Sequence, residues 1–433
     1  MLQALCAGPA QSASLGPSRA QIHARPVGHS TPGVRESILY AFQGGSRDGA
    51  SPVAPLISDA TGALYGTTTD GGARDSGTVF KLTPAGSGFT ESILHAFRGG
   101  DFDGAYPVAG LLGNSAGTLF GTTSGGGSRK CVRQLRLPGC GVVFALTPSG
   151  REYKESVLYA FLGGSDGAEP LAGLIEDSNG VLYGTTYQSD EIATAGTVFT
   201  LTPAGSAYHE NVIFGFPYLY SEPFYPDGSY PAAPVISDSS GAFYGTTQFG
   251  GGASSCLIEF QECGVAYKLT PSPGGYTAGT LHEFGNAGDG VNPVAGLVAD
   301  GAGALYGTTQ YGGASNLGTV FKLTPNGATY IESILYAFQG GADGALPVAS
   351  LVLEGGSLYG TTASGGPANV GTVFSLTPSG SSYTESVLYA FKGGKNDGAD
   401  PEAALIVDGL GNLYGTTARG GAADAGTVFT LAL

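Results

Sequence analysis

The chain has 433 residues, with 18 Lys or Arg against 34 Asp or Glu, so its formal net charge is −16. Such an acidic surface repels phosphate backbones, which argues against nucleic acid as a partner. No apolar stretch reaches the roughly 18 residues of a membrane span. The 76 Gly and 25 Pro recur at fixed offsets between short Val, Ile, Tyr, Phe and Thr runs, a pattern typical of many short strands joined by tight turns.

Residues 1–33 precede the first repeated motif and are rich in Ala, Ser, Pro and Gln. Their weakly apolar start lacks the basic region and the long apolar core of a secretion signal. We therefore expect a disordered leader at 1–33 and one folded domain at 34–433.

The folded part contains seven copies of one pentapeptide, Leu-Tyr-Gly-Thr-Thr or a close variant. Self-similarity at this period indicates a repeat architecture. The glycines of the seven copies are Gly66, Gly121, Gly184, Gly245, Gly307, Gly360 and Gly415.

The first unit shows how each repeat should fold. Its short β-type runs predict an inner strand over 52–57, a second over 63–68, a third over 77–83 and an outer strand over 89–97. Four antiparallel strands per unit, repeated around an axis, are typical of a β-propeller blade. The sequence therefore predicts an all-β, seven-bladed propeller.

Small and turn-forming residues support this order of strands. Pro52 begins the predicted inner strand and Ala54 follows it, a small side chain suited to the crowded axis. Asp59 precedes Gly62 by three residues, as expected of a hairpin turn in which Asp caps the backbone and Gly takes a positive φ.

The two ends of the chain predict circular closure. The outer-strand pattern Glu-Ser-Ile-Leu-Tyr-Ala-Phe occurs at 36–42, before any inner strand, whereas the last unit stops after its third strand at 427–432. If residues 34–42 supply the outer strand of the seventh blade, two open sheet edges disappear.

Two kinds of loop should share one face of the disc: the connection into each blade, with its Asp-Gly, and the loop between second and third strands, with its double glycine. A ring of carboxylates could hold calcium or bind sugar hydroxyls, but Asp-Gly is also simply a good turn. We expect no cofactor and no metal, with calcium as the alternative. The Asp-Gly residues are Asp48, Asp103, Asp166, Asp227, Asp289, Asp343 and Asp397.

Departures from the repeat gather in the second to fourth units. The connection over 216–227 is expanded and aromatic, with Tyr230 just beyond it, and the third unit replaces its double glycine by a polar stretch at 187–191. Such a surface could stack sugars or dock a peptide, or it could only cover a neighbouring loop. The predicted ligand-binding residues are Asp103, Asp166, Tyr187, Asp190, Tyr218, Tyr220, Tyr225 and Asp227.

Two local cysteine pairs, Cys131 with Cys140 and Cys256 with Cys263, lie in equivalent loops of the second and fourth units. Each pair closing its own loop predicts two disulfides and an exported protein. Zinc is the less favoured alternative, because the cysteine spacings are longer than in zinc ribbons and no histidine is near.

No catalytic constellation stands out. His95, His209 and His282 fall on predicted outer strands, where they form no sequence cluster. Paired acids on the loop face keep a polysaccharide hydrolase or lyase open as the alternative function. The candidate acids are Asp101, Asp103, Asp166, Glu169, Asp190 and Glu191.

The combination of Leu-Tyr-Gly-Thr-Thr, a double glycine, Gly-Thr-Val-Phe-Lys-Leu-Thr-Pro at 77–84 and 318–325, and Glu-Ser-Ile-Leu-Tyr-Ala-Phe resembles the GloVer tandem-repeat proteins over residues 34–433. That resemblance implies a bacterial surface or secreted protein and supplies no catalytic residues. We expect a monomeric, extracellular, non-catalytic binding or scaffold module for a glycan or protein ligand.

Overall fold

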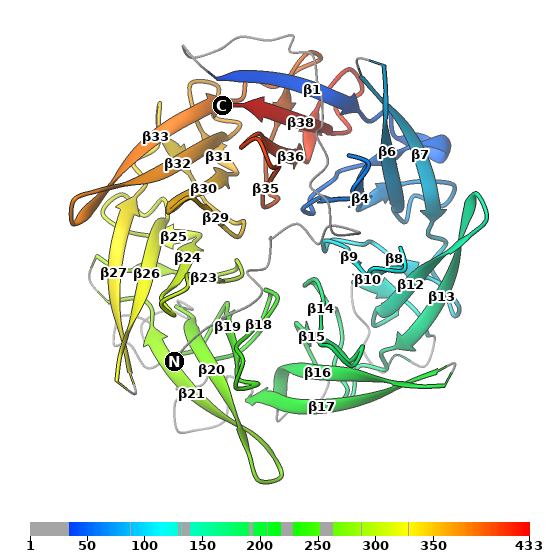
Figure 1. Ribbon diagram of the computed structural model, residues 1–433, viewed down its shortest axis with the longest axis horizontal. Coiled ribbons are helices and arrows are strands. Elements are labelled where there is room, and N and C mark those ends of the chain that lie inside the picture. Colours follow the sequence, from blue (N-terminus) through cyan, green and yellow to red (C-terminus); the bar gives the residue numbers. More distant parts are fainter. Residues whose placement is uncertain are drawn as a thin grey trace.

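The computed structural model describes residues 34–86, 88–128, 131, 139–189, 194–205, 207–217, 228–251, 263–286, 288–327 and 329–433. Within these residues, seven four-stranded antiparallel sheets are arranged radially around one axis (Figure 1). The predicted seven-bladed propeller is therefore confirmed.

The first blade has the order β3 (Ile57–Ser58), β4 (Leu64–Thr68), β6 (Thr78–Ala85) and β7 (Gly88–Ala96) from the axis outward. The next five blades are β9 (Leu112–Gly113), β10 (Leu119–Thr123), β12 (Val142–Ser149), β13 (Glu152–Ala160); β14 (Ile175–Glu176), β15 (Leu182–Thr186), β16 (Thr194–Ala204), β17 (Ala207–Pro217); β18 (Ile236–Ser237), β19 (Phe243–Thr247), β20 (Val265–Ser272), β21 (Gly275–Glu283); β23 (Val298–Ala299), β24 (Leu305–Thr309), β26 (Thr319–Asn326), β27 (Thr329–Ala337); and β29 (Val352–Glu354), β30 (Ser357–Thr362), β32 (Thr372–Ser379), β33 (Ser382–Ala390).

The seventh blade closes the ring with both ends of the chain. Its strands are β35 (Ile406–Val407), β36 (Leu413–Thr417), β38 (Thr427–Ala432) and, outermost, β1 (Arg35–Ala41). β1 pairs antiparallel with β38, with Glu36 opposite Leu431. Figure 1 shows this pairing where the blue strand β1 and the red strand β38 lie side by side. The predicted closure is confirmed, and it removes the open edge of β38.

The inner strands are shorter than the sequence predicted. In the first blade only Ile57 and Ser58 pair with β4, although the expected strand was 52–57. Pro52 and Pro55 carry no N–H and so cannot donate to a ladder. Val53, Pro55 and Leu56 instead line the axis.

A hydrogen bond between neighbouring blades, from a Thr hydroxyl to an Ala carbonyl, accounts for part of the repeated motif. The first Thr of each pentapeptide donates its hydroxyl to the carbonyl of the inner-segment Ala of the next blade. Thr416 donates to the Ala54 carbonyl at 3.2 Å and so joins the last blade to the first. The other six bonds are Thr67 to Ala109, Thr122 to Ala172, Thr185 to Ala233, Thr246 to Ala295, Thr308 to Ala349 and Thr361 to Ala403.

Aromatic rings fill the space between blades. Phe42, which follows β1, is fully buried and packs edge-to-face on Phe80 of the first blade, with ring centroids 5.1 Å apart, a favourable geometry for aromatic pairs. The motif glycine makes room for this layer, because a Cβ on Gly66 would lie 2.6 Å from the Phe80 ring. Equivalent pairs are Phe97–Phe144, Phe161–Phe199, Phe216–Tyr267, Phe284–Phe321, Phe338–Phe374 and Phe391–Phe429.

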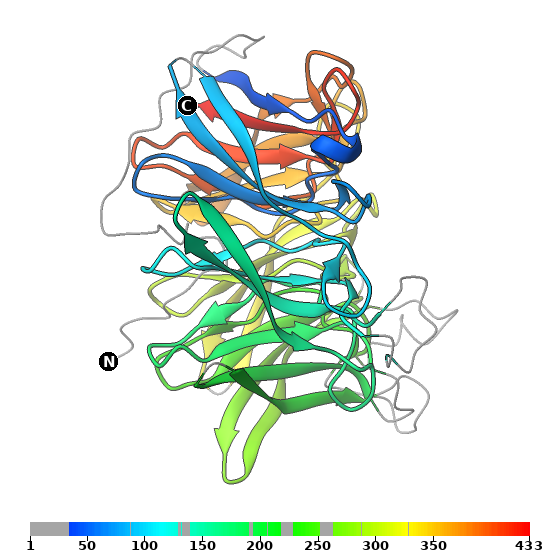
Figure 2. The ribbon, with the colours of Figure 1, turned by 90° about the vertical axis from the view of Figure 1, so that its right-hand side faces the viewer.

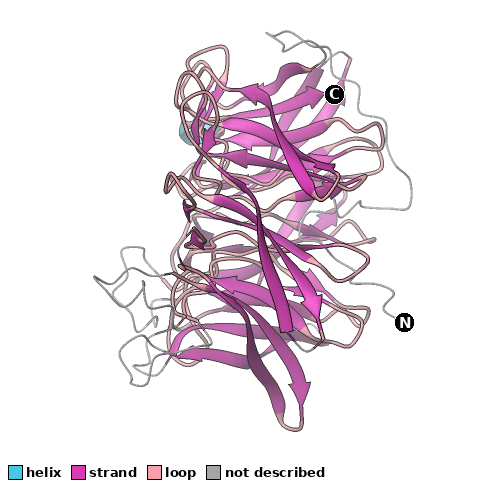
Figure 3. Ribbon diagram, turned by 90° about the vertical axis from the view of Figure 1, so that its left-hand side faces the viewer, coloured by secondary structure: helices cyan, strands magenta, loops and turns pink. Residues whose placement is uncertain are grey.

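Figure 3 shows strands and loops throughout the described part of the chain, apart from one short 3-10 turn, η1 (Gly45–Arg47). No helix in that part is long and apolar enough to cross a bilayer.

Candidate functional site

Two kinds of loop lie together on one face of the disc, here called the loop face. β2 (Gly49–Ala50), in the connection into the first blade, pairs with β5 (Asp70–Gly71), in the loop between the second and third strands. Figure 2 shows these loops gathered along one edge of the disc. The other pairs are β8 (Gly104–Ala105) with β11 (Gly125–Gly126), β22 (Gly290–Val291) with β25 (Tyr311–Gly312), β28 (Gly344–Ala345) with β31 (Ser364–Gly365), β34 (Gly398–Ala399) with β37 (Arg419–Gly420), and the bridges Ala168↔Gln188 and Ser229↔Phe249.

The double glycine permits this pairing. Gly71 has φ +83°, and a Cβ there would lie 2.5 Å from the carbonyl oxygen of Asp48. Only glycine combines that left-handed backbone with so close an approach.

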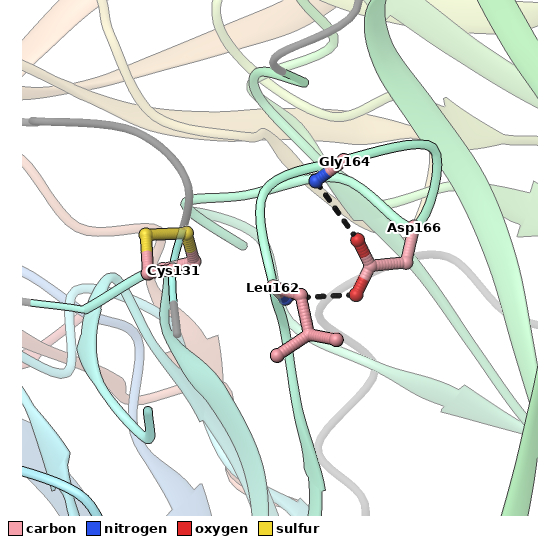
Figure 4. The surroundings of a disulfide bond; sticks show 5 residues. Cys131, Leu162, Gly164 and Asp166 are labelled. Atoms are coloured by element: carbon pink, nitrogen blue, oxygen red, sulfur yellow. Dashed lines mark hydrogen bonds between the residues drawn. A yellow bond between two sulfur atoms is a disulfide. The ribbon is translucent and has the colours of Figure 1, made fainter. Parts of the chain in front are cut away.

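Asp103 and Asp166, two predicted ligand residues, hold the connections on this face. Asp166 accepts hydrogen bonds from the N–H groups of Leu162 at 2.8 Å and Gly164 at 3.1 Å (Figure 4). Asp103 lies 3.1 Å from His95 Nε2 and accepts backbone N–H groups in the same way. Both carboxylates thus organise their own connection, and their contact with a ligand stays a prediction.

Each described Asp-Gly carboxylate accepts a backbone N–H from the segment that follows the preceding outer strand, and among the described residues no three of these carboxylates lie within 4.8 Å of one another. Those described besides Asp103 and Asp166 are Asp48, Asp289, Asp343 and Asp397. Calcium at this ring remains a prediction.

An axial cavity of about 330 Å³ runs through the inner segments of all seven blades. Its wall is largely aliphatic, and the residue after each inner-segment proline contributes one side chain. These seven residues are Val53, Val108, Leu171, Ala232, Val294, Val348 and Glu402.

One residue per blade, directly before the inner-segment proline, has a positive φ without being glycine. Tyr230, at φ 59°, donates its N–H to the Ala195 carbonyl at 2.8 Å and accepts the Gln248 N–H at 3.0 Å. A left-handed backbone costs about 1 kcal/mol or more for a residue with a Cβ, so these hydrogen bonds maintain a strained conformation. The seven residues, here called the left-handed ring, are Ser51, Tyr106, Glu169, Tyr230, Asn292, Leu346 and Asp400.

The left-handed ring surrounds the loop-face end of the axial cavity, because each member stands two positions before a cavity-lining residue. Its members share this backbone conformation but include hydroxyl, aromatic, acidic, amide and aliphatic side chains. Backbone strain that the surrounding structure maintains is a pointer to function.

Aromatic side chains meet on the loop face between the third and fourth blades. Tyr187 lies with its ring centroid 5.2 Å from that of Tyr230, which in turn lies 5.3 Å from Phe249. The Tyr187 hydroxyl donates to Gln248 Oε1 at 2.6 Å. All four side chains are half-buried. We call Tyr187, Tyr230 and Phe249 the aromatic cluster.

Polar groups flank the aromatic cluster. Gln188 donates its amide to Glu169 Oε2 at 2.9 Å, which places a carboxylate and an amide next to Tyr187. Sequence reasoning did not identify Gln248 and Phe249 as site residues, although both directly follow the Thr-Thr of the fourth pentapeptide, as Tyr187 does in the third.

The predicted disulfide between Cys131 and Cys140 is present, with a Cα–Cα distance of 5.5 Å. Figure 4 shows it beside the connection that carries Asp166. Cys263 is also disulfide-bonded. Cys256 and five predicted ligand residues, Asp190, Tyr218, Tyr220, Tyr225 and Asp227, lie outside the described residues.

A set of three side chains, one Tyr or His, one Asp and one Glu, recurs between neighbouring blades. At the first interface, Tyr40 donates its hydroxyl to Asp48 at 3.0 Å, and Glu91 of the next outer strand approaches both. Burial, and secondarily Asp48, raises the pKa of Glu91 to about 7. Equivalent sets are His95–Asp103–Glu155, Tyr159–Asp166–Glu210, His282–Asp289–Glu332, Tyr336–Asp343–Glu385 and Tyr389–Asp397–Glu36.

The set His282, Asp289 and Glu332 could hold a metal ion, because its ligand atoms lie within 4.8 Å of one another. It contains both of the ligand types, imidazole and carboxylate, that divalent transition metals prefer.

The sequence pattern of the Gloeobacter/Verrucomicrobia repeat matches residues 29–256 and again 258–433. None of the curated proteins is similar in sequence to this chain. Among solved structures, PorZ, a surface component of the type-IX secretion system of Porphyromonas gingivalis, is 16% identical over 92% of this chain and 48% of PorZ, with a TM-score of 0.50. A putative 6-phosphogluconolactonase of Bacteroides fragilis is 15% identical over 82% of this chain and 87% of its own, with a TM-score of 0.49. At this level of identity the likeness concerns the fold.

Proposed function

Because the chain belongs to the Gloeobacter/Verrucomicrobia repeat family and its repeat builds the whole propeller, we propose that it is a non-catalytic binding module whose ligand is a glycan. The glycan binds on the loop face over the second to fourth blades. The aromatic cluster is the observation that carries this proposal.

Glycan chemistry matches the groups that meet there. A sugar ring has an apolar C–H face that packs on an aromatic ring, while its hydroxyls donate to and accept from carboxylates and amides. Tyr187 and Tyr230 offer half-buried rings. Gln188 follows Tyr187 in the chain and donates to Glu169, whose carbonyl accepts the Tyr187 N–H. Rigid aromatic groups combined with a few placed polar groups are typical of ligand sites.

An extracellular or cell-surface location is part of the proposal. The disulfide between Cys131 and Cys140 supports it, because disulfides persist in oxidising compartments. A location outside the cell also gives the protein access to polysaccharide.

A binding screen with product analysis tests the proposal. The purified chain is titrated by calorimetry with a panel of soluble neutral and uronic-acid polysaccharides, and each mixture is analysed for new reducing ends. We expect saturable binding without cleavage. The double variant Tyr187→Thr, Tyr230→Ser should weaken binding at least about tenfold, which corresponds to about 1.4 kcal/mol.

The variant is chosen so that folding is preserved, since Thr69 and Ser51 occupy the equivalent positions of the first blade. Tyr311→Asp, which removes a partly exposed tyrosine from the fifth blade, is the matched control and should bind as the parent does. If the double variant binds polysaccharide as tightly as the parent does, the aromatic cluster is not the binding site. Cleavage of the polysaccharide contradicts the non-catalytic role, and the absence of saturable binding to every polysaccharide of the panel contradicts the ligand class.

A further inference from the structure

The Asp–Glu pairs between blades are completed by two different kinds of side chain. At four described interfaces the third member is a tyrosine, whose hydroxyl donates to the Asp. At two it is a histidine: His95 lies 3.1 Å from Asp103, and His282 lies 2.9 Å from Asp289. A neutral phenol is a poor metal ligand, whereas an imidazole nitrogen is a good one. The histidines therefore change what the interface can bind.

The set His282–Asp289–Glu332 is compact. His282 comes from β21, Asp289 from the connection into the fifth blade and Glu332 from β27. Their ligand atoms all lie within 4.8 Å of one another, and no other group of His, Cys, Asp or Glu among the described residues meets this condition. The His282 and Asp289 side chains are 19% and 7% exposed.

Glu332 supplies a buried carboxylate oxygen at this interface. Its Oε1 accepts no hydrogen bond, and the same is true of the equivalent glutamates at the other five described interfaces. The His282 imidazole and the short distances between ligand atoms, rather than this oxygen, distinguish the set. Asp289 accepts the N–H groups of Gly285 at 3.2 Å and Gly290 at 2.6 Å, so it is built to carry negative charge. A buried oxygen without a partner is costly, and a divalent cation would satisfy it while neutralising both carboxylates.

We propose that His282, Asp289 and Glu332 bind a divalent transition-metal ion, zinc first, between the fourth and fifth blades. One imidazole nitrogen and two carboxylate oxygens form a set that zinc accepts, with water at the fourth position. Ligand atoms around tetrahedral zinc lie about 3.3 Å apart, given bond lengths near 2.1 Å, so small side-chain rotations close the site. The ion clamps two neighbouring outer strands together.

The other interfaces provide a comparison within the same molecule. His95, Asp103 and Glu155 have the same ligand types, but their atoms are more widely spaced than those of the His282 set. We expect weaker binding there. The four tyrosine interfaces lack the nitrogen ligand, and we expect them to bind no zinc.

Metal binding by the intact chain tests the proposal. After treatment with a chelator and its removal, the protein is titrated with ZnCl₂ by calorimetry, and the visible absorption of bound Co²⁺ is recorded. The informative variant is His282→Tyr, since tyrosine occupies the equivalent position at four other interfaces and the fold accommodates it. His95→Tyr is the matched control.

We expect the parent and His95→Tyr to bind one Zn²⁺ tightly. At a hundredfold excess of Zn²⁺ over its Kd, their Tm should rise by about 3 °C. His282→Tyr and Glu332→Gln should lose that ion, its Co²⁺ absorption and the rise in Tm. The proposal is overturned if the parent binds no zinc, or if His282→Tyr binds it with unchanged stoichiometry and affinity.

Discussion

The blade interfaces and the loop face obey opposite rules. Between blades the same contacts recur with almost no variation: the Thr–Ala hydrogen bond occurs seven times, and the buried aromatic pair occurs seven times. On the loop face the backbone recurs while the side chains change, so the left-handed ring holds Ser, Tyr, Glu, Asn, Leu and Asp in one conformation. A repeat protein can thus vary its surface freely wherever the backbone hydrogen bonds alone maintain the geometry.

The largest expected effect comes from breaking closure. Deletion of residues 1–42 removes β1 and Phe42, so β38 loses its partner and Phe80 loses its aromatic contact. Exposed edge strands associate, and we expect aggregation or no cooperative unfolding transition, checked by size-exclusion chromatography and calorimetry. Deletion of residues 1–33 alone should leave the Tm unchanged, and a stable monomer after the longer deletion would contradict the role of closure.

Adding one methyl group at the glycine of the pentapeptide tests how tightly the blades pack. A Cβ on Gly66 would lie 2.6 Å from the Phe80 ring, so Gly66→Ala should lower the free energy of unfolding by about 2 kcal/mol or more, the range of overpacked cores. Denaturant unfolding measures the change. Gly88→Ala, where no atom lies within 4 Å of the added Cβ, should change stability little and serves as the control.

The tyrosine-type interfaces predict a dependence of stability on pH. Burial first, and a neighbouring Asp second, raise the pKa of Glu36 to about 8 and of Glu91, Glu210 and Glu385 to about 7, from an ordinary value of 4.5. Lys392 partly opposes the shift at Glu36. Between pH 4.5 and about 8 the folded chain therefore binds more protons than the unfolded chain, so stability falls as pH rises through this window.

We expect a Tm that is several degrees lower at pH 8 than at pH 5, measured by calorimetry in matched ionic strength. The fourfold Glu→Gln variant at these positions keeps the shape of a protonated glutamate and should flatten the profile. If the Tm of the parent rises over the same pH window, the folded chain does not bind more protons than the unfolded chain there, and the explanation is contradicted.

Removing one ring-closing hydrogen bond has a smaller effect. Thr416→Val deletes the hydroxyl that donates to the Ala54 carbonyl at 3.2 Å and leaves that carbonyl without this donor. We expect a loss of about 1 kcal/mol in the free energy of unfolding, measured by urea denaturation. Thr361→Val, which removes the same bond between the sixth and seventh blades, should cost as much if closure is no weaker than any other interface.

The smallest effect should come from the loop face and have the opposite sign. Leu346 has φ 58°, which its Cβ disfavours, whereas Asn tolerates this conformation and already occupies it as Asn292. Leu346→Asn should stabilise the fold by about 0.5 kcal/mol. Unfolding by urea, compared with Leu346→Ala, would show whether relief of backbone strain is responsible.

Much of the fold could be predicted because the evidence for it is local and repeated. Asp59 was expected to cap a hairpin turn, and it accepts the N–H groups of Thr61 and Ala63. The inner strand was predicted too long, because apolar residues with prolines indicate position near the axis but not ladder pairing. The binding sector stays a prediction, and Gln248 and Phe249, which contact its tyrosines, were not foreseen because nothing in their own segment distinguishes them.

The amino-acid sequence by itself determined the seven units, the order of strands in each, the closure by residues 34–42 and the pairing of Cys131 with Cys140. These depend on contacts between residues close along the chain, or on a pattern repeated often enough to be recognised. Only the tertiary structure decided that Tyr187, Tyr230 and Phe249 meet, that one residue before each inner proline is left-handed, and that His282 approaches Glu332. Those contacts cross from one blade to the next, so they depend on the angle and register between units, which no single unit encodes.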